Sequence, residues 1–284
     1  MEKIKNMTND PQLLIYEVRK RKKDYIFWGI SIFIVLLIFL FIFSKEIYVL
    51  QTLSSMTKTL SFIIILIKVF NFESCSGLSV NSLICFFLSF FCRNFVVIFF
   101  SVRLRNFKVD TVNSTFNTIS EFISFFIICI LLYAIYFKYS VTSDITLDGR
   151  MPFYYLVIPA FLLAIPFKPW IYRYWFIDLI WIFSIFLESI SIYPQIILFS
   201  SKKGHIEHFT SHYLALQGIS SVFEVIYWIK TYFKFNDRRS LLLGEYSGYL
   251  IMFSEIVKSV ILAYYLLLYS KSLIKTRNHK KFDI

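Results

Sequence analysis

The chain has 284 residues, of which 57% are hydrophobic and 17% are charged, and its formal net charge is +12. A soluble domain has about 45–50% apolar and about 25% charged residues, so both values indicate that much of this chain faces lipid. This composition excludes a disordered chain and a small disulfide scaffold, and it argues strongly against a soluble enzyme. We find no Gly-rich phosphate loop, no Ser-His-Asp order, no metal-binding spacing of Cys and His, and no nucleic-acid-binding module. We therefore predict no enzyme, cofactor, metal site or nucleic-acid partner.

Apolar segments follow one another along most of the chain, each near the ~20 residues that a membrane-spanning helix needs. The first has a longer apolar core than the ~7–15 residues of a signal peptide and lacks a small-residue cleavage site, so we interpret it as a retained span. The fifth is short. We predict eight spans, at residues 26–43, 53–70, 83–102, 119–137, 152–167, 175–199, 209–233 and 246–269.

Lysine and arginine residues predict the orientation of these spans. Both tails, residues 1–25 and 271–284, are strongly basic, and eight spans place them on the same side of the membrane. The loops of that side together with the tails hold more Lys and Arg than the opposite loops, so we expect both termini in the cytosol. Basic tails beside spans lie naturally on an anionic bilayer, so the positive charge requires no nucleic acid.

Charged side chains inside the predicted spans are the candidates for function, because such charges are costly in lipid and face a partner or a cavity. Arg93 lies deep in an apolar stretch, and its planar guanidinium suits bidentate binding of a carboxylate. Two interpretations stay open: a structural ion pair with Asp178 or Glu188, or a cation that faces a water-filled cavity and awaits a ligand carboxylate. The charges that we single out are Arg93, Asp178, Glu188, Glu224, Lys230, Glu255 and Lys258, and Lys58 lies near the lumenal start of the second span.

Four segments resemble the KDEL receptors, the ER lumen protein-retaining receptors, and they occur in the same order. Residues 181–195 (WIFSIFLESISIYPQ) resemble the family signature WTFSIYLESVAILPQ. Residues 74–79 (SCSGLS) resemble the SCAGIS loop, residues 203–214 resemble the KTG…TTHYL segment, and residues 228–229 match part of the WIW segment. The similarity extends from about residue 50 to residue 281.

The resemblance implies an all-α membrane protein. Its core would be a seven-helix bundle like those of the PQ-loop and SWEET transporters, with two three-helix repeats joined by a linking helix. Here one extra N-terminal helix would precede that bundle, for eight spans in all. The expected organisation is a cytosolic basic tail at 1–25, an extra span with a lumenal linker at 26–50, the seven-helix domain at 51–270 and a cytosolic basic tail at 271–284.

The family binds C-terminal tetrapeptide signals of escaped ER proteins and returns them from the Golgi in coated vesicles. By resemblance, Arg93 would clamp the ligand carboxylate, Asp178 would meet the basic end of the signal, and Trp181, Glu188 and Trp228 would line the cavity. We also expect Glu224 to read the basic side and Lys58 to replace lost positive charge. The implied partners are the peptide signal, the bilayer and a vesicle coat, and Lys275, Lys280 and Lys281 are the candidate contacts with the coat. The expected location is the ER and Golgi membranes.

The pocket departs from the family more than the scaffold does. Gln51 and Thr231 stand where the family has ligand-binding arginines, and Ser220-Ser221 replace a tyrosine-arginine pair. Lys58 stands where the family has a pH-sensing histidine. A lysine, with an ordinary pKa of ~10.4, stays charged through the secretory pathway. We therefore expect ligand binding to depend weakly on pH, unless a carboxyl with a shifted pKa, such as that of Glu188 or Glu224, supplies the switch.

These departures leave two alternatives to a receptor. One is a relative that has lost ligand binding and acts as a membrane adaptor. The other is a small-solute transporter of the PQ-loop type, although Pro194-Gln195 has no matching pair in the first repeat.

Overall fold

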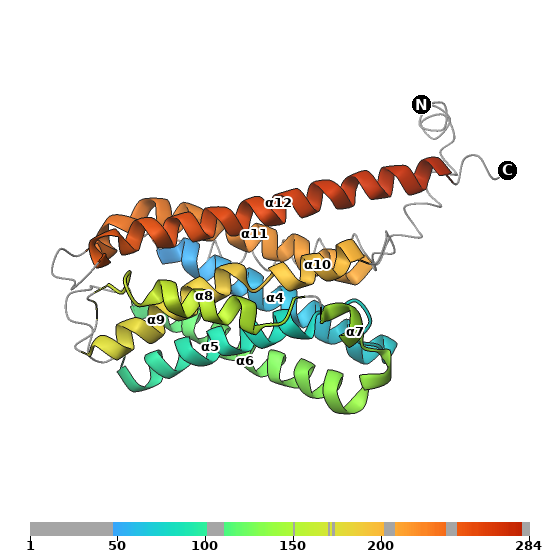
Figure 1. The fold of residues 1–284 in the computed structure, drawn as a ribbon, viewed down its shortest axis with the longest axis horizontal. Coiled ribbons are helices and arrows are strands. Elements are labelled where there is room, and N and C mark those ends of the chain that lie inside the picture. The colour runs from blue at the N-terminus through green and yellow to red at the C-terminus, as the bar shows by residue number, and fades with distance from the viewer. Residues whose placement is uncertain are drawn as a thin grey trace. The chain divides into compact units, whose positions relative to one another are not determined.

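The computed structural model describes residues 48–100, 111–149, 151–169, 171, 174–201, 208–236 and 243–279, and these residues form a bundle of helices (Figure 1). The long helices are α4 (Tyr48–Phe72), α5 (Val80–Phe100), α6 (Thr111–Tyr133), α9 (Trp175–Ile190), α11 (His208–Thr231) and α12 (Ser247–His279). The shorter ones are α7 (Ile145–Asp148), α8 (Tyr154–Ala164) and α10 (Tyr193–Ser201). A π-helical turn, Ala134–Lys138, continues α6, and single 3-10 turns lie at Ser140–Thr142, Tyr232–Phe235 and Gly244–Tyr246.

The predicted spans from residue 53 onward each coincide with a helix except the sixth, at 175–199, which is divided into α9 and α10 by a break at residues 191–192. The predicted span at 26–43 lies outside the described residues. Among the described helices, five are long and apolar enough to cross a membrane, and α8 is apolar but shorter. α11 has the length of a span but is more polar than those five. α4 begins at Tyr48, five residues before the predicted start, so Lys58 lies near the middle of its helix and not near its beginning.

The packing of the helices shows two triplets with the same internal order. In the first triplet α6 packs against both α4 and α5, and in the second α12 packs against both α9 and α11. The triplets meet where α4 packs against α11 and where α5 packs against α9, while α8 packs on α9. This is the arrangement of two three-helix repeats and a linking helix that the resemblance implies.

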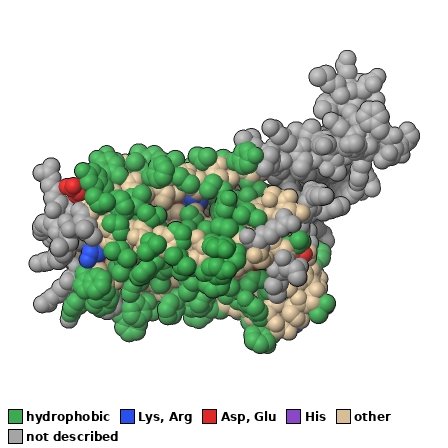
Figure 2. Space-filling model, in the orientation of Figure 1, with side chains coloured by type: hydrophobic (Ala, Val, Ile, Leu, Met, Phe, Trp, Pro, Cys, Tyr) green, Lys and Arg blue, Asp and Glu red, His purple; other side chains and the backbone are tan. Residues whose placement is uncertain are grey.

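Apolar side chains fill the bundle and also cover its outside. Phe62 of α4 is fully buried and meets the rings of Phe86 and Phe90 of α5 edge-on, with centroids 5.3 and 6.1 Å apart. On the face seen in Figure 2, hydrophobic side chains cover most of the helices. Phe99, Phe126 and Leu162 are among the large apolar side chains exposed on the outside of the bundle, an arrangement that water would not favour but lipid tails would. The protein is therefore an all-α membrane protein.

Hydrogen bonds from two shorter helices hold the start of α5. Asp148 of α7 accepts hydrogen bonds from the Ser79 hydroxyl (2.5 Å) and from the Asn81 backbone N–H (2.9 Å), so it caps α5. Gln195 of α10 accepts a hydrogen bond from the Ser79 N–H (2.8 Å) and donates one to the Gly77 carbonyl (2.7 Å). The short helices α7 and α10 thus fix the loop that joins α4 to α5.

Candidate functional site

A continuous chain of charged side chains of alternating sign crosses the interior of the bundle. Neighbours in this chain are joined by ion pairs, and all six long helices contribute to it. We call this set the charge network, and in order its members are Glu121, Arg93, Glu188, Lys58, Glu224, Lys258 and Glu255.

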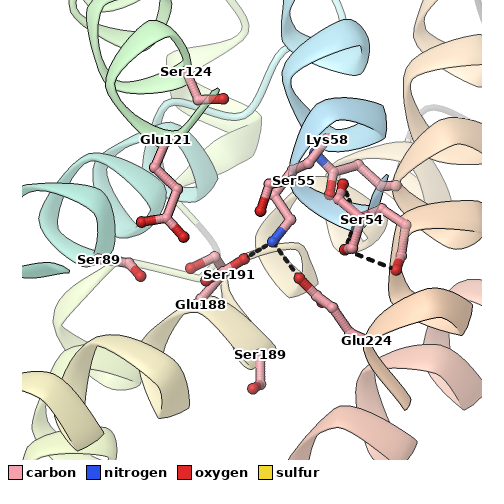
Figure 3. Close-up of polar contacts among 12 residues, drawn as sticks. Ser54, Ser55, Lys58, Ser89, Glu121, Ser124, Glu188, Ser189, Ser191 and Glu224 are labelled. Atoms are coloured by element: carbon pink, nitrogen blue, oxygen red, sulfur yellow. Dashed lines mark hydrogen bonds and ion pairs between the residues drawn. The ribbon is translucent and has the colours of Figure 1, made fainter. Parts of the chain in front are cut away.

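Lys58 is the centre of the charge network. Its ammonium group lies between the carboxylates of Glu188 and Glu224, as Figure 3 shows, and the Glu224 oxygen is 2.6 Å from Nζ. Arg93 uses two different nitrogens: Nη1 is 3.1 Å from Glu121, and Nη2 pairs with Glu188. Each of these cations therefore holds two carboxylates from two other helices.

The network continues on the α12 side. Lys258 pairs with Glu224 and, at 2.5 Å, with Glu255 one turn before it on the same helix. The Glu255 carboxylate also accepts a hydrogen bond from the Ser189 hydroxyl (3.0 Å). Because an unpaired charge in a low-dielectric interior is strongly unfavourable, this mutual pairing is what allows seven ionisable groups to lie inside the bundle.

The network follows the two-repeat arrangement with the charges inverted. The first helices of the triplets contribute Lys58 and Glu188, and the second helices contribute Arg93 and Glu224. The third helices contribute Glu121 and Lys258, each paired with the second helix of its own triplet. Helices that hold the same place in the two triplets thus contribute opposite charges to the network. Glu255 is the one network member outside this relation.

Small polar residues bring the helices close together around the network. Ser54 and Ser220 join α4 to α11: their hydroxyl oxygens are 2.8 Å apart, and each lies 3.0 Å from the other residue's carbonyl oxygen, to which it can donate its one hydrogen. Thr59 bonds to Ser124 of α6 (2.8 Å) in the same way. Small side chains at helix interfaces permit such close approach in membranes, and these contacts hold the charged residues in register.

The two predicted interpretations of Arg93 can now be compared with its surroundings. The structure pairs Arg93 with Glu188, one of the two predicted partners, and adds Glu121. Asp178, the other candidate, is buried near the start of α9 and accepts a hydrogen bond from the Ile171 backbone N–H (3.0 Å). The guanidinium is thus held by internal carboxylates, although its side chain is still 15% exposed.

The remaining predicted site residues lie in several places. Trp228 is buried and Trp181 packs against the same apolar cluster between α5, α8 and α9. Lys230, one of the charges in the predicted spans, is exposed on α11. Lys275 lies within α12, and Lys280 and Lys281 lie outside the described residues.

Glu121 and Asn94 belong to the site but were not predicted to do so. Glu121 lies just inside the predicted fourth span, so its presence as a carboxylate in an apolar segment was the signal that could have identified it. Asn94 follows Arg93 on α5, is only 4% exposed, and neither polar atom of its side-chain amide has a hydrogen-bond partner among the described residues. A buried amide without a partner is rare and indicates water or a ligand nearby.

Comparison with known proteins agrees with these observations. The family model described as ER lumen protein retaining receptor matches residues 74–231. ER lumen protein-retaining receptor 3 of Mus musculus is 32% identical over 201 residues, which are 69% of this chain and 85% of the relative. ER lumen protein-retaining receptor erd-2.2 of Caenorhabditis elegans is 28% identical over 238 residues, 81% of this chain and 97% of the relative. The chain belongs to the ER lumen protein-retaining receptor family.

Proposed function

We propose that this protein is a retrieval receptor of the early secretory pathway, which binds C-terminal peptide signals of ER lumenal proteins and returns those proteins from the Golgi to the ER in vesicles. The names of its relatives support this role. The observation that carries the proposal is the Arg93 guanidinium, which lies inside the bundle and is the most exposed cation of the charge network. By resemblance, Arg93 falls on the family's carboxylate-binding position.

In this proposal the ligand binds by exchange of ion pairs. Glu121 and Glu188 hold the guanidinium in place, and the carboxylate at the end of a peptide competes with them for its N–H donors. Glu224, the most exposed acid of the network at 12%, receives the basic group of the peptide. Asn94 supplies a buried amide that can bond to the peptide backbone.

The test compares free and amidated peptides. Purified full-length protein in nanodiscs is titrated with C-terminal tetrapeptides that differ only in a free carboxylate or a C-terminal amide. We expect the amide to bind at least tenfold more weakly, because a charge-assisted hydrogen bond to Arg93 is lost. Arg93→Lys keeps the charge but loses the planar fork, so it should weaken binding of the free acid and leave the amide unaffected.

A matched control is Lys138→Ala, because Lys138 lies exposed in the π-helical turn after α6. This variant should bind the free acid as the unmodified protein does. Equal affinity for the acid and the amide would refute the clamp and, with it, the receptor.

The return step needs a cytosolic signal, for which the basic C-terminal tail is the candidate. Replacing Lys275, Lys280 and Lys281 by alanine should weaken coat binding and shift the protein from the ER toward the Golgi. Immunofluorescence with markers for both organelles measures this shift, and an unchanged distribution would exclude the tail as the retrieval signal.

A second candidate function is a membrane adaptor that binds no signal. One observation favours it: within the described network, each cation is already paired with the protein's own carboxylates. Correct localisation of the protein, together with no binding of any free-carboxylate peptide, would establish this alternative.

A further inference from the structure

The charge network holds one more acid than base. Lys58, Arg93 and Lys258 are its cations, whereas its carboxylates come from four glutamates, Glu121, Glu188, Glu224 and Glu255. Side chains in the network are between 4% and 15% exposed, so water screens these charges poorly. With all four glutamates ionised, a ligand that enters the network meets an interior with one excess negative charge.

A peptide carboxylate increases this excess. If it binds Arg93, five carboxylates share three cations. Glu121, when displaced, loses its paired cation in the network, whereas Glu188 loses Arg93 but keeps Lys58. Every further acidic side chain of the ligand adds to the repulsion, and every basic side chain offsets it. The network thus selects ligands by their total charge as well as by their terminal carboxylate.

A second observation indicates that a polar ligand fits beside the network. Asn94 follows Phe90 by one turn, and Lys58 precedes Phe62 by one turn on the neighbouring helix. The contact between Phe62 and Phe90 and the opposite directions of two consecutive spans place Asn94 at about the height of Lys58. The amide of Asn94 is buried and has no partner in the described part of the chain, so a peptide group could satisfy it.

We propose that the signal bound by this receptor carries a net positive charge: one free C-terminal carboxylate and more than one basic side chain, without acidic ones. This inference rests on the proposed function and defines its ligand class. The absence of arginine at Gln51, Ser221 and Thr231, where the family has cations, agrees with it. An acidic signal of the Lys-Asp-Glu-Leu type is then a poor ligand for this protein.

The test uses three N-acetylated tetrapeptides with free carboxylates and different net charges. They are acetyl-Lys-Gln-Lys-Leu (+1), acetyl-Lys-Gln-Gln-Leu (0) and acetyl-Lys-Asp-Glu-Leu (−2). The full-length protein, in an uncharged detergent at one pH and one ionic strength, is titrated with each by calorimetry. We expect affinity to fall in this order, with at least a tenfold difference between the first and the last. Acetyl-Lys-Gln-Lys-Leu amide measures non-specific binding of a cationic peptide.

Two variants assign the effect to the network. Glu224→Gln removes one acid, so it should reduce the preference for the +1 peptide over the neutral one at least threefold. Glu245→Gln, in the exposed 3-10 turn before α12, removes the same charge outside the network and should leave the preference unchanged. The unmodified protein alone still decides the question if Glu224→Gln fails to fold.

The outcomes separate this inference from the proposed function. Tighter or equal binding of the −2 peptide, with the amide binding more weakly than the acid, would refute the charge selection and leave the receptor standing. Failure of all three free acids to bind, or equal binding of acid and amide, would refute the receptor itself.

Discussion

Lys58 is the residue on which the charge network depends most, because Glu188 and Glu224 share its ammonium group. Lys58→Met leaves two buried carboxylates with less compensation, and removing one partner of a buried ion pair costs about 3–5 kcal/mol. We expect a clear loss of thermal stability in detergent, measured by differential scanning fluorimetry, whereas Lys58→Arg should retain most of it.

The double variant Lys58→Met/Glu188→Gln separates charge balance from packing. It restores the charge difference of the unmodified network, so it should be more stable than Lys58→Met alone. If the loss of stability in the double variant equals the sum of the losses in Lys58→Met and Glu188→Gln, the two residues do not interact energetically.

Lys58 also determines how ligand binding responds to pH. None of the seven network residues is a histidine, the side chain that ordinarily titrates in this range. Two carboxylates, from Glu188 and Glu224, stabilise the charged form of Lys58, although these carboxylates also pair with Arg93 and Lys258. We therefore expect Lys58 to keep its proton near neutrality. We expect peptide affinity to change less than about threefold between pH ~5.5 and ~7.5, since a lysine has an ordinary pKa of ~10.4. Calorimetric titrations at both values measure this, and a steep change that disappears in Lys58→Met would contradict it.

Sequence reasoning at this scale identified the ionisable residues better than their partners. Arg93, Glu188 and Glu224 were predicted from their cost in lipid, but the pairing of Lys258 with Glu224 and the role of Glu121 required knowledge of which helix faces lie together. The position of a charge along the chain is visible in the sequence, whereas its contact across helices depends on rotation and register, which a span of apolar residues does not specify.

At the scale of elements, α7 and α10 hold the loop between α4 and α5. Gln195→Ala removes both hydrogen bonds of the amide and leaves the Ser79 N–H and the Gly77 carbonyl unsatisfied. Since a buried unsatisfied group costs about 1–3 kcal/mol, we expect a loss of at least about 2 kcal/mol, measured as a lower melting temperature in detergent. Ser200→Ala, exposed on the same helix, is the control and should melt as the unmodified protein does.

The same glutamine is the second residue of the Pro-Gln pair that the sequence analysis considered as a mark of a solute transporter. In the structure its amide joins α10 to the loop of the other repeat, which is a structural task. Pro194 lies in the first turn of α10, where a missing N–H is tolerated, just after the break that ends α9. Both residues therefore have a role in the fold that requires no transported solute.

For the whole molecule, hydropathy and resemblance together predicted the helices and the two triplets well. Spans of apolar residues are directly visible, and each predicted span from residue 53 onward is helical, although the span at 175–199 is broken into α9 and α10. α11 is the informative case: it carries Gln217, Ser220 and Glu224 toward the other helices and is too polar for a simple hydropathy criterion. The inverted charges of the two triplets could not be predicted, because they depend on which charged residues pair across the helices.

The orientation of the whole chain is the last prediction. Seven of the predicted spans lie between the start of α4 and the end of α12, and because seven is an odd number, these two ends should lie on opposite sides of the membrane. If residues 26–43 add one span, both ends of the chain lie in the cytosol, as the basic tails require. Epitope tags at both termini should then be digested by protease added to intact microsomes. A protected N-terminal tag beside a digested C-terminal tag would mean that residues 26–43 do not cross. Removal of residues 1–44 is the matched control: it should place a new N-terminal tag in the lumen and leave the C-terminal tag accessible.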